Sequence, residues 1–251
     1  MRHDFIDKYS DRNSTVHRID ARVKIICVLI FIAIATSIMN IYALIASFFV
    51  LTGVFVVSRV PLKWAFLKAS IVIPFAGSFA LIKALTIAGS PIFSWWVLNL
   101  TSEGVTTAAL LFFRAYISVY TVVLLTSTTR FPTLLAALEK LKVPPLITSM
   151  VSFTYRYIFV FTDEAERLER AKAAKCIEGA QYRLRLSASA KTIGLVFIRA
   201  YERGERIYRS MLSRGFDGTI NTSDTIEIKR HDIFAGVTFI AFTALLTIVL
   251  R

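Results

Sequence analysis

The chain has 251 residues, of which 55% are hydrophobic and 19% charged, and its formal net charge is +13. A soluble domain is about 45–50% apolar, so this excess, gathered into long runs, excludes an ordinary soluble domain and indicates a membrane protein. The positive charge is compatible with nucleic-acid binding, but beside such runs it is better explained by Lys and Arg retained on the cytoplasmic side. We therefore expect lipid, and no nucleic acid, around this chain.

The N-terminal half predicts a helical hairpin followed by a third span. Residues 1–22 are mixed and charged, without the pattern of a cleavable signal peptide, and we expect them on the cytoplasmic face. The run 25–58 has no charged residue and is too long for one crossing of a core roughly 30 Å thick. It predicts two helices that turn at the polar residues 36–40. The basic loop 59–63 then precedes a span at residues 64–87, which Pro74 should kink.

Two further spans are expected, at residues 105–127 and 231–250. Residues 88–104 between the third and fourth spans carry no Lys or Arg but include Trp95 and Trp96, which predicts an outer interfacial loop. Because the loops at 59–63 and 130–230 are basic, the N-terminus and the long region are predicted to be cytoplasmic, with the C-terminus outside.

Arg114 lies well inside the predicted fourth span. A charge at that depth is costly and normally faces protein or a water-filled cavity. It is either a coupling contact of a transport assembly or a structural partner that only fixes helix packing, and the second interpretation is favoured.

The region 130–230 predicts three amphipathic helices. A short one follows Pro132, with leucines at helical spacing, and residues 143–145 end it. Two long patterns follow, 145–176 and 182–213. The first is apolar at its start and the second in its middle, and both become charged toward their ends. Gly215 can adopt the left-handed geometry of a helix cap, which places Arg214 at a helix tip. A guanidinium there suits a carboxylate partner, although an Arg near a helix C-terminus is also ordinary.

Four sets of residues carry a recognisable pattern: 20–24, Thr129-Arg130 with Pro132, Tyr155-Arg156-Tyr157, and the two tripeptides at the helix ends, Ala174-Lys175-Cys176 and Ser213-Arg214-Gly215. Together they resemble the transmembrane (T) components of energy-coupling factor (ECF) transporters, a branch of the ABC importers, over nearly the whole chain. The N-terminal segments 5–9 and 17–20 further resemble the cobalt-type, CbiQ-like subgroup.

The resemblance implies partners and a docking site. In that family two helix-end motifs with a central Arg dock into grooves on two ABC-type ATPase subunits, and a separate membrane subunit (S) captures the substrate. By resemblance, Ser213-Arg214-Gly215 is the second motif. Ala174-Lys175-Cys176 falls where the first is expected, with Lys in place of Arg and Cys in place of Gly. Lys supplies charge but not the planar two-pronged contact.

The sequence thus predicts an all-α membrane protein with about five transmembrane helices plus long cytoplasmic amphipathic coupling helices. Its expected parts are residues 1–129 with four spans, the coupling region 130–230 and a last span at 231–251. We expect a coupling subunit for cobalt uptake, with no catalytic residue, metal site or cofactor of its own. ATP is expected to bind to partner subunits, because a phosphate-binding G-x-x-x-x-G-K-[ST] motif is absent from this sequence. Nickel or vitamin transport, a membrane enzyme and a stand-alone carrier are the alternatives.

Overall fold

The computed structural model of the protein describes residues 9, 12, 14–87, 91–95, 98–174, 181–216 and 230–249. The chain divides into two compact units. The larger unit consists of Asp4–Ala137 with Thr225–Arg251, and the smaller of Met1–His3 with Leu138–Asp224. The proposed surface helix at residues 5–9 falls almost entirely outside the described residues.

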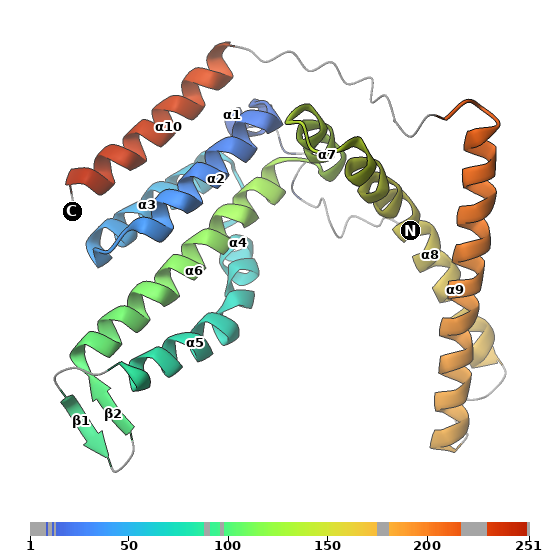
Figure 1. The fold of residues 1–251 in the computed structure, drawn as a ribbon, viewed down its shortest axis with the longest axis horizontal. Coiled ribbons are helices and arrows are strands. Elements are labelled where there is room, and N and C mark those ends of the chain that lie inside the picture. Colours follow the sequence, from blue (N-terminus) through green and yellow to red (C-terminus); the bar gives the residue numbers. More distant parts are fainter. Residues whose placement is uncertain are drawn as a thin grey trace. The chain divides into compact units, whose positions relative to one another are not determined.

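The larger unit is a block of helices with one small hairpin of strands (Figure 1). Its elements are α1 (Thr15–Arg18), α2 (Ala21–Ser37), α3 (Ile41–Val57), α4 (Leu62–Ala69), the 3-10 turn η1 (Ser70–Val72), α5 (Ile73–Thr86), β1 (Pro91–Trp95), β2 (Leu98–Thr101), α6 (Ser102–Thr128) and α10 (Arg230–Val249).

Polar residues begin the first long helices as N-caps. The side chain of Asp20 accepts a hydrogen bond from the backbone N–H of Arg22 at the start of α2, and that of Asn40 accepts one from Tyr42 at the start of α3. Each bond satisfies one of the backbone donors that a helix start leaves unpaired. The predicted helical hairpin is therefore found, with its turn at residues 38–40.

The predicted kink in the third span is also found. Helix α4 ends at Ala69, η1 follows, and Pro74 lies in the first turn of α5, where its missing N–H removes no helix bond. Residues Leu62–Thr86 are nevertheless long and apolar enough to cross a membrane, as is α6, whereas α3 is a shorter apolar helix. The fold is that of an all-α membrane protein.

One segment that was predicted to be a loop forms a pair of strands. Where an interfacial loop was predicted, β1 and β2 pair antiparallel from Pro91 opposite Thr101 to Trp95 opposite Leu98. The bulky apolar residues of this segment favour strands, and pairing two strands satisfies backbone groups that an irregular loop would leave to solvent. Thr101 then caps α6 through its hydroxyl, which accepts from Gly104 N–H.

Helices α3, α4 and α6 bury an aromatic core. Tyr120 of α6 is fully buried, with its ring centroid 4.4 Å from that of Phe55 and 5.4 Å from those of Phe48 and Phe66. Aromatic pairs at such distances add to the free energy of burial, so this cluster holds three helices together.

Helix α10 packs closely against α2 through a glycine. A Cβ atom added to Gly236 would lie 2.7 Å from Val23 Cγ1 and 2.9 Å from Cys27 Sγ. Only a residue without a side chain lets the two backbones approach this closely, so Gly236 sets the position of α10 on α2.

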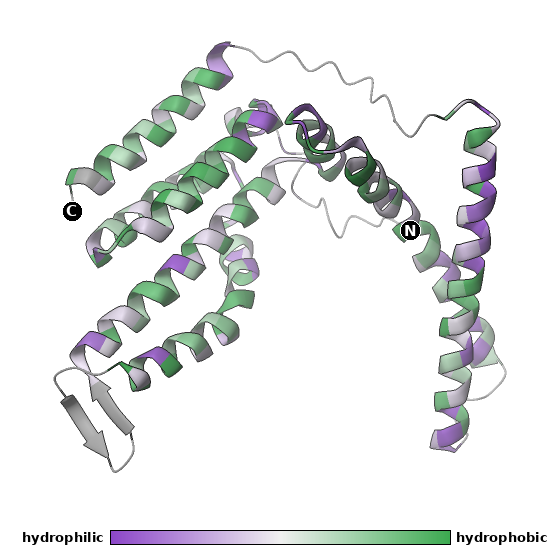
Figure 2. Cartoon of the chain, viewed as in Figure 1, coloured by the Kyte–Doolittle hydropathy of each residue, from purple (hydrophilic) through white to green (hydrophobic). Residues whose placement is uncertain are grey.

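The smaller unit is built on two long helices, α8 (Pro145–Ala174) and α9 (Tyr182–Leu212). The short amphipathic helix α7 (Phe131–Lys140) precedes them and contains the boundary between the two units. Two residues after its end, Lys142 lies in the left-handed region (φ 67°), and Pro145 begins α8. Figure 2 shows hydrophilic residues along much of α9, whereas α2 and α3 are mostly hydrophobic.

Candidate coupling interface

Helices α8 and α9 contact each other in an antiparallel sense. Glu164 of α8 forms an ion pair with Arg199 of α9, and Lys172, near the end of α8, donates to the hydroxyl of Ser189, near the start of α9, at 3.4 Å. A second ion pair, Glu166 with Arg170 at 3.7 Å, joins residues four apart on α8, as the charge spacing predicts. The two predicted long helices therefore form a pair.

The other end of the pair is apolar. A groove of about 330 Å³ lies between the first half of α8 and the last half of α9. Tyr157 comes from the Tyr-Arg-Tyr segment singled out in the sequence, and Met211 and Phe216 come from the end of α9. The helix pair is thus held by charge at one end and by apolar side chains at the other.

The end of α9 has a defined cap. Gly215 has a φ of +81°, its N–H donates to the Leu212 carbonyl at 3.0 Å, and the N–H of Phe216 donates to the Met211 carbonyl at 3.0 Å. These two bonds form the Schellman motif, which ends a helix with glycine in the left-handed region. The predicted cap geometry at Gly215 is therefore found.

Arg214 lies in this cap and is exposed. Within the described part of the chain its guanidinium has no hydrogen bond or ion pair, while the neighbouring Ser213 hydroxyl donates to the Ser210 carbonyl at 2.9 Å. An unpaired guanidinium on a rigid helix end presents a planar fork to a carboxylate or a carbonyl of another molecule.

The structure describes only the first residue of the first predicted docking motif. Ala174 is the last residue of α8, and Lys175 and Cys176 lie outside the described residues. Since Lys172 contacts Ser189, the end of α8 lies beside the start of α9. At 1.5 Å per residue, the capped end of α9 is then roughly 35 Å away along its axis. The two predicted docking ends lie at opposite ends of the helix pair.

Lys24 joins two segments that the family resemblance singles out. It is 9% exposed, and its Nζ donates to the Thr128 carbonyl at 3.0 Å, to the Thr129 hydroxyl at 3.2 Å and to the His17 carbonyl at 3.3 Å. Thr128 ends α6, and the extended Thr129 follows it immediately before α7. Lys24 therefore anchors the start of the coupling region to α2.

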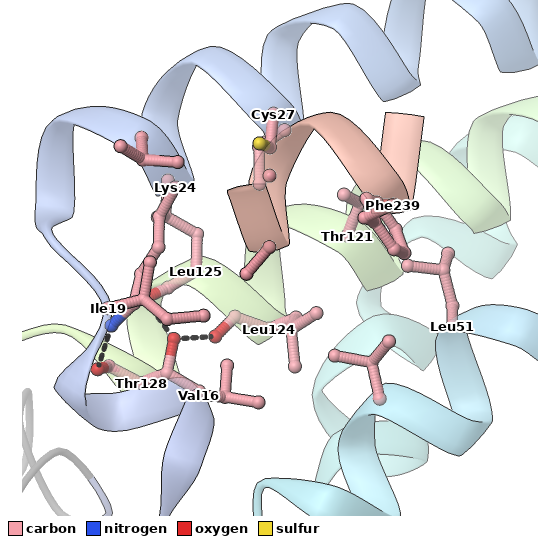
Figure 3. Close-up of a pocket in the computed structure, with 15 residues that line it drawn as sticks. Val16, Ile19, Lys24, Cys27, Leu51, Thr121, Leu124, Leu125, Thr128 and Phe239 are labelled. Atoms are coloured by element: carbon pink, nitrogen blue, oxygen red, sulfur yellow. Dashed lines mark hydrogen bonds between the residues drawn. The ribbon is translucent and has the colours of Figure 1, made fainter. Parts of the chain in front are cut away.

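The Lys24 contacts border a cavity of about 200 Å³ among α1, α2, α3, α6 and α10. Figure 3 shows the Lys24–Thr128 hydrogen bond near one end of the cavity and Leu51, Thr121 and Phe239 toward the other. The lining is otherwise almost entirely apolar. The Lys24 amine therefore lies between this apolar lining and the C-terminal end of α6.

The side chain of His17 is half-buried. Its Nδ1 lies 2.7 Å from the Ser14 hydroxyl oxygen and its Nε2 lies 3.2 Å from the Tyr9 carbonyl oxygen. Burial lowers the pKa of His17 below its usual value, and the positive charges of Lys24 and Arg12 act in the same direction.

Arg114 pairs with a backbone group. Its Nε donates to the Ile38 carbonyl at 3.0 Å, and its Nη2 contacts the same oxygen. Ile38 follows the last residue of α2, where carbonyls are left unpaired and the helix dipole favours a cation. This contact supports the structural interpretation of Arg114, which joins α6 to the α2–α3 turn.

Sequence reasoning did not find the Lys24 anchor. The available signal was that Lys24 is the last charged residue before the apolar run and belongs to the segment 20–24, but its partners Thr128 and Thr129 lie 104 and 105 positions away. Among the described residues, no group of three or more His, Cys, Asp and Glu side chains is arranged to hold a metal ion.

The sequence is similar to those of several known proteins. The family model described as CbiQ, cobalt transport protein, matches residues 12–225. The energy-coupling factor transporter transmembrane protein EcfT of Ruminiclostridium cellulolyticum is 28% identical over 95% of this chain and 94% of its own length. EcfT of Listeria innocua is 29% identical over 85% of this chain and 84% of its own. A putative fused cobalt transport protein, CbiMQ, of Methanocorpusculum labreanum is 32% identical over 48% of this chain and 20% of its own.

The chain belongs to the CbiQ family, the transmembrane (T) components of ECF transporters. It is a membrane-embedded transport component, and the relatives' names describe transporter subunits rather than enzymes.

Proposed function

We propose that this chain couples ATP hydrolysis in two separate ABC-type ATPase subunits to movement of a separate substrate-capturing membrane subunit, in the uptake of cobalt ion. The observation that carries the proposal is Arg214, an exposed guanidinium without a partner among the described residues, at a capped helix end. ATP would bind to the partner subunits.

The helix pair acts as the lever in this proposal. One ATPase subunit docks at Ser213-Arg214-Gly215 and the other at Ala174-Lys175-Cys176. Because these ends lie at opposite ends of α8 and α9, closure of the two ATPases pushes on both ends of one packed unit. Packed helices move as rigid bodies between discrete arrangements, so this motion is passed to the membrane subunit that holds the ion.

The proposed orientation places the N-terminus and the coupling region in the cytoplasm and makes the chain a multi-pass protein of the cell membrane. The basic loop at residues 59–63 supports this side as the inner one. Cobalt is favoured over nickel or a vitamin by the description of the family and by the name of the CbiMQ relative.

The docking step is tested by charge reversal in the reconstituted complex. Arg214→Glu replaces the guanidinium with an acid and should abolish ATP-driven uptake. Arg203→Glu is the matched control, because Arg203 is also exposed on α9 but lies about three turns before the cap. Arg214→Lys should retain only part of the activity. Normal uptake by Arg214→Glu would refute the docking role.

The substrate is tested separately by purifying the wild-type complex in mild detergent and identifying the subunits that accompany it. An ATPase and a metal-capturing membrane subunit, together with uptake of radioactive cobalt, are expected. If an ATPase accompanies the chain together with a vitamin-binding subunit instead of a metal-capturing one, the cobalt assignment is wrong and the coupling role stands.

A further inference from the structure

A basic pocket lies where α1 meets the end of α3. It has a volume of about 480 Å³ and is lined by Ser14, Thr15, Arg18, Val57 and Arg59. None of these residues is acidic; two of them carry guanidiniums and two carry hydroxyls, of which the Ser14 hydroxyl already contacts His17. Such a lining suits an anion with several oxygen atoms.

No acidic side chain in the described part of the chain forms an ion pair with the guanidiniums that line this pocket. Within the described residues, the side chains of Arg18 and Arg59 are exposed and have no hydrogen bond or ion pair. The guanidinium of Arg12 donates to the carbonyl of Arg59, which brings a third positive charge to the pocket's edge. Three like charges this close repel one another, and a bound anion removes that repulsion.

The backbone of Arg59 also indicates a role for its side chain. Its φ is +57°, in the left-handed region. A residue with a Cβ atom is strained there by about 1 kcal/mol, whereas glycine is not. Glycine would be more stable than arginine in this backbone conformation. Residues with backbone strain of this kind are concentrated at binding sites.

An exposed apolar face of α3 runs up to the pocket. Phe49, Val56 and Val57 on this helix are 68%, 59% and 56% exposed, and Val57 itself lines the pocket. An anion held by the arginines therefore has an apolar helix face beside it. A phospholipid combines these two chemistries in one molecule, whereas a free phosphate uses only the first.

Aromatic and basic side chains near the pocket indicate that this part of the protein lies at a membrane interface. The rings of Tyr9 and Trp64 lie 4.8 Å apart, the Arg12 guanidinium lies 5.1 Å from the Tyr9 ring, and Lys68 Nζ lies 5.9 Å from the Trp64 ring. Tyr and Trp with Lys and Arg concentrate at the headgroup level of a bilayer.

We propose that this pocket binds the phosphate of an anionic phospholipid of the inner leaflet, with the guanidiniums of Arg18 and Arg59 on the phosphate and an acyl chain along Phe49, Val56 and Val57. Basic pockets of this kind recognise lipid headgroups on the cytoplasmic side of membrane proteins. The site needs no partner subunit, so it stands apart from the coupling function.

The test measures phospholipid binding to the purified full chain by native mass spectrometry. Phosphatidylglycerol is the anionic probe and phosphatidylcholine the zwitterionic one. The double variant Arg18→Gln with Arg59→Gln should bind phosphatidylglycerol at least about tenfold more weakly than wild type, since a charge-assisted bond is lost at each position. Arg183→Gln with Arg203→Gln removes the same charge from α9 and should leave binding unchanged.

A single variant separates binding from folding. Arg59→Gly removes the guanidinium and relieves the left-handed backbone, so its melting temperature should equal or exceed that of wild type while phosphatidylglycerol binding falls. Unchanged binding in this variant and in the double variant would overturn the proposal. An equal loss in the α9 control would show attraction by net charge alone and would overturn it too.

The free anion is distinguished by competition. Millimolar inorganic phosphate should not displace phosphatidylglycerol, because it lacks the apolar contact with α3. If inorganic phosphate competes as well as the lipid does, the pocket is a phosphate site and the lipid assignment is wrong. Every one of these measurements uses the chain without ATPase, so failure here leaves the coupling proposal untouched.

Discussion

Lys24 Nζ lies 3.0 Å from the carbonyl oxygen of Thr128, 104 positions further along the chain. The bond joins the first turn of α2 to the last residue of α6, directly before the segment that leads to α7. One of the backbone connections between the membrane block and the coupling helices begins at this point, and Lys24 fixes one side of it.

Replacing Lys24 with Met should destabilise the membrane block. The variant keeps the length of the side chain but loses three hydrogen bonds from a buried amine. A hydrogen bond to a charged group contributes about 1.5–3 kcal/mol, and a loss near 2 kcal/mol lowers the melting temperature of a chain this size by about 5 °C. Thermal unfolding in detergent measures this.

The matched control is Lys63→Met, because Lys63 is exposed in the same unit. It should change the melting temperature little. Equal melting temperatures for the two variants would show that the Lys24 contacts contribute nothing to stability.

Gly215→Ala should loosen the end of α9. Nothing lies within 4 Å of an added Cβ, so the cost comes only from the φ of +81°, about 1 kcal/mol. We expect faster hydrogen exchange at residues 211–216 and weaker ATPase docking, because Arg214 loses its fixed position. Gly204→Ala on the same helix has equal space and an ordinary backbone, and it should leave both unchanged.

Arg114→Leu should lower stability by leaving the Ile38 carbonyl without its donors. Arg114→Lys keeps a charge near the end of α2 and should recover part of the melting temperature. Thermal unfolding and ATP-driven uptake are measured together. A variant with wild-type stability but no uptake would contradict the structural interpretation and favour a role in coupling.

Gly236→Ala should separate α10 from α2, since the new methyl group would lie under 3 Å from Val23 and Cys27. Overpacking of this kind costs about 1–3 kcal/mol. Gly53→Ala in α3, where nothing lies within 4 Å, is the control. A melting temperature for Gly236→Ala at or above that of Gly53→Ala would show that the two helices are not held as closely as described.

The stability of the membrane block should fall as the pH drops through the usual pKa of histidine. Burial lowers the pKa of His17 from 6.5, so the unfolded chain binds a proton that the folded chain resists. Stability is then fully present above this pH and lost below it. His17→Gln should flatten the melting temperature between pH 8 and pH 5, and identical profiles would exclude His17 as the cause.

Much of the helical pattern was predictable because it depends on neighbours in the chain. The apolar run, Pro74 and Gly215 each act through local backbone geometry, and the structure has the hairpin, the break and the cap where these residues predict them. The positions of α8 and α9 follow similarly from Pro145 and the change from apolar to charged residues.

The tertiary partners were not predictable. Lys24 and Arg114 find backbone carbonyls, which every residue carries, so no residue type marks the partner in the sequence. The close approach at Gly236 depends on a helix more than two hundred positions away. The predicted docking role of Arg214 awaits its test, and Lys175 and Cys176 lie outside the described residues.

The contact of Gly236 with α2 has a consequence for biogenesis. Helix α10 is made after every other described helix, yet it packs on α2, which precedes most of them. During synthesis the surface of α2 around Val23 and Cys27 stays uncovered by α10 while the intervening segments are made. Insertion of α10 then covers that surface, so the packing of the membrane block is completed only after the coupling helices have been synthesised.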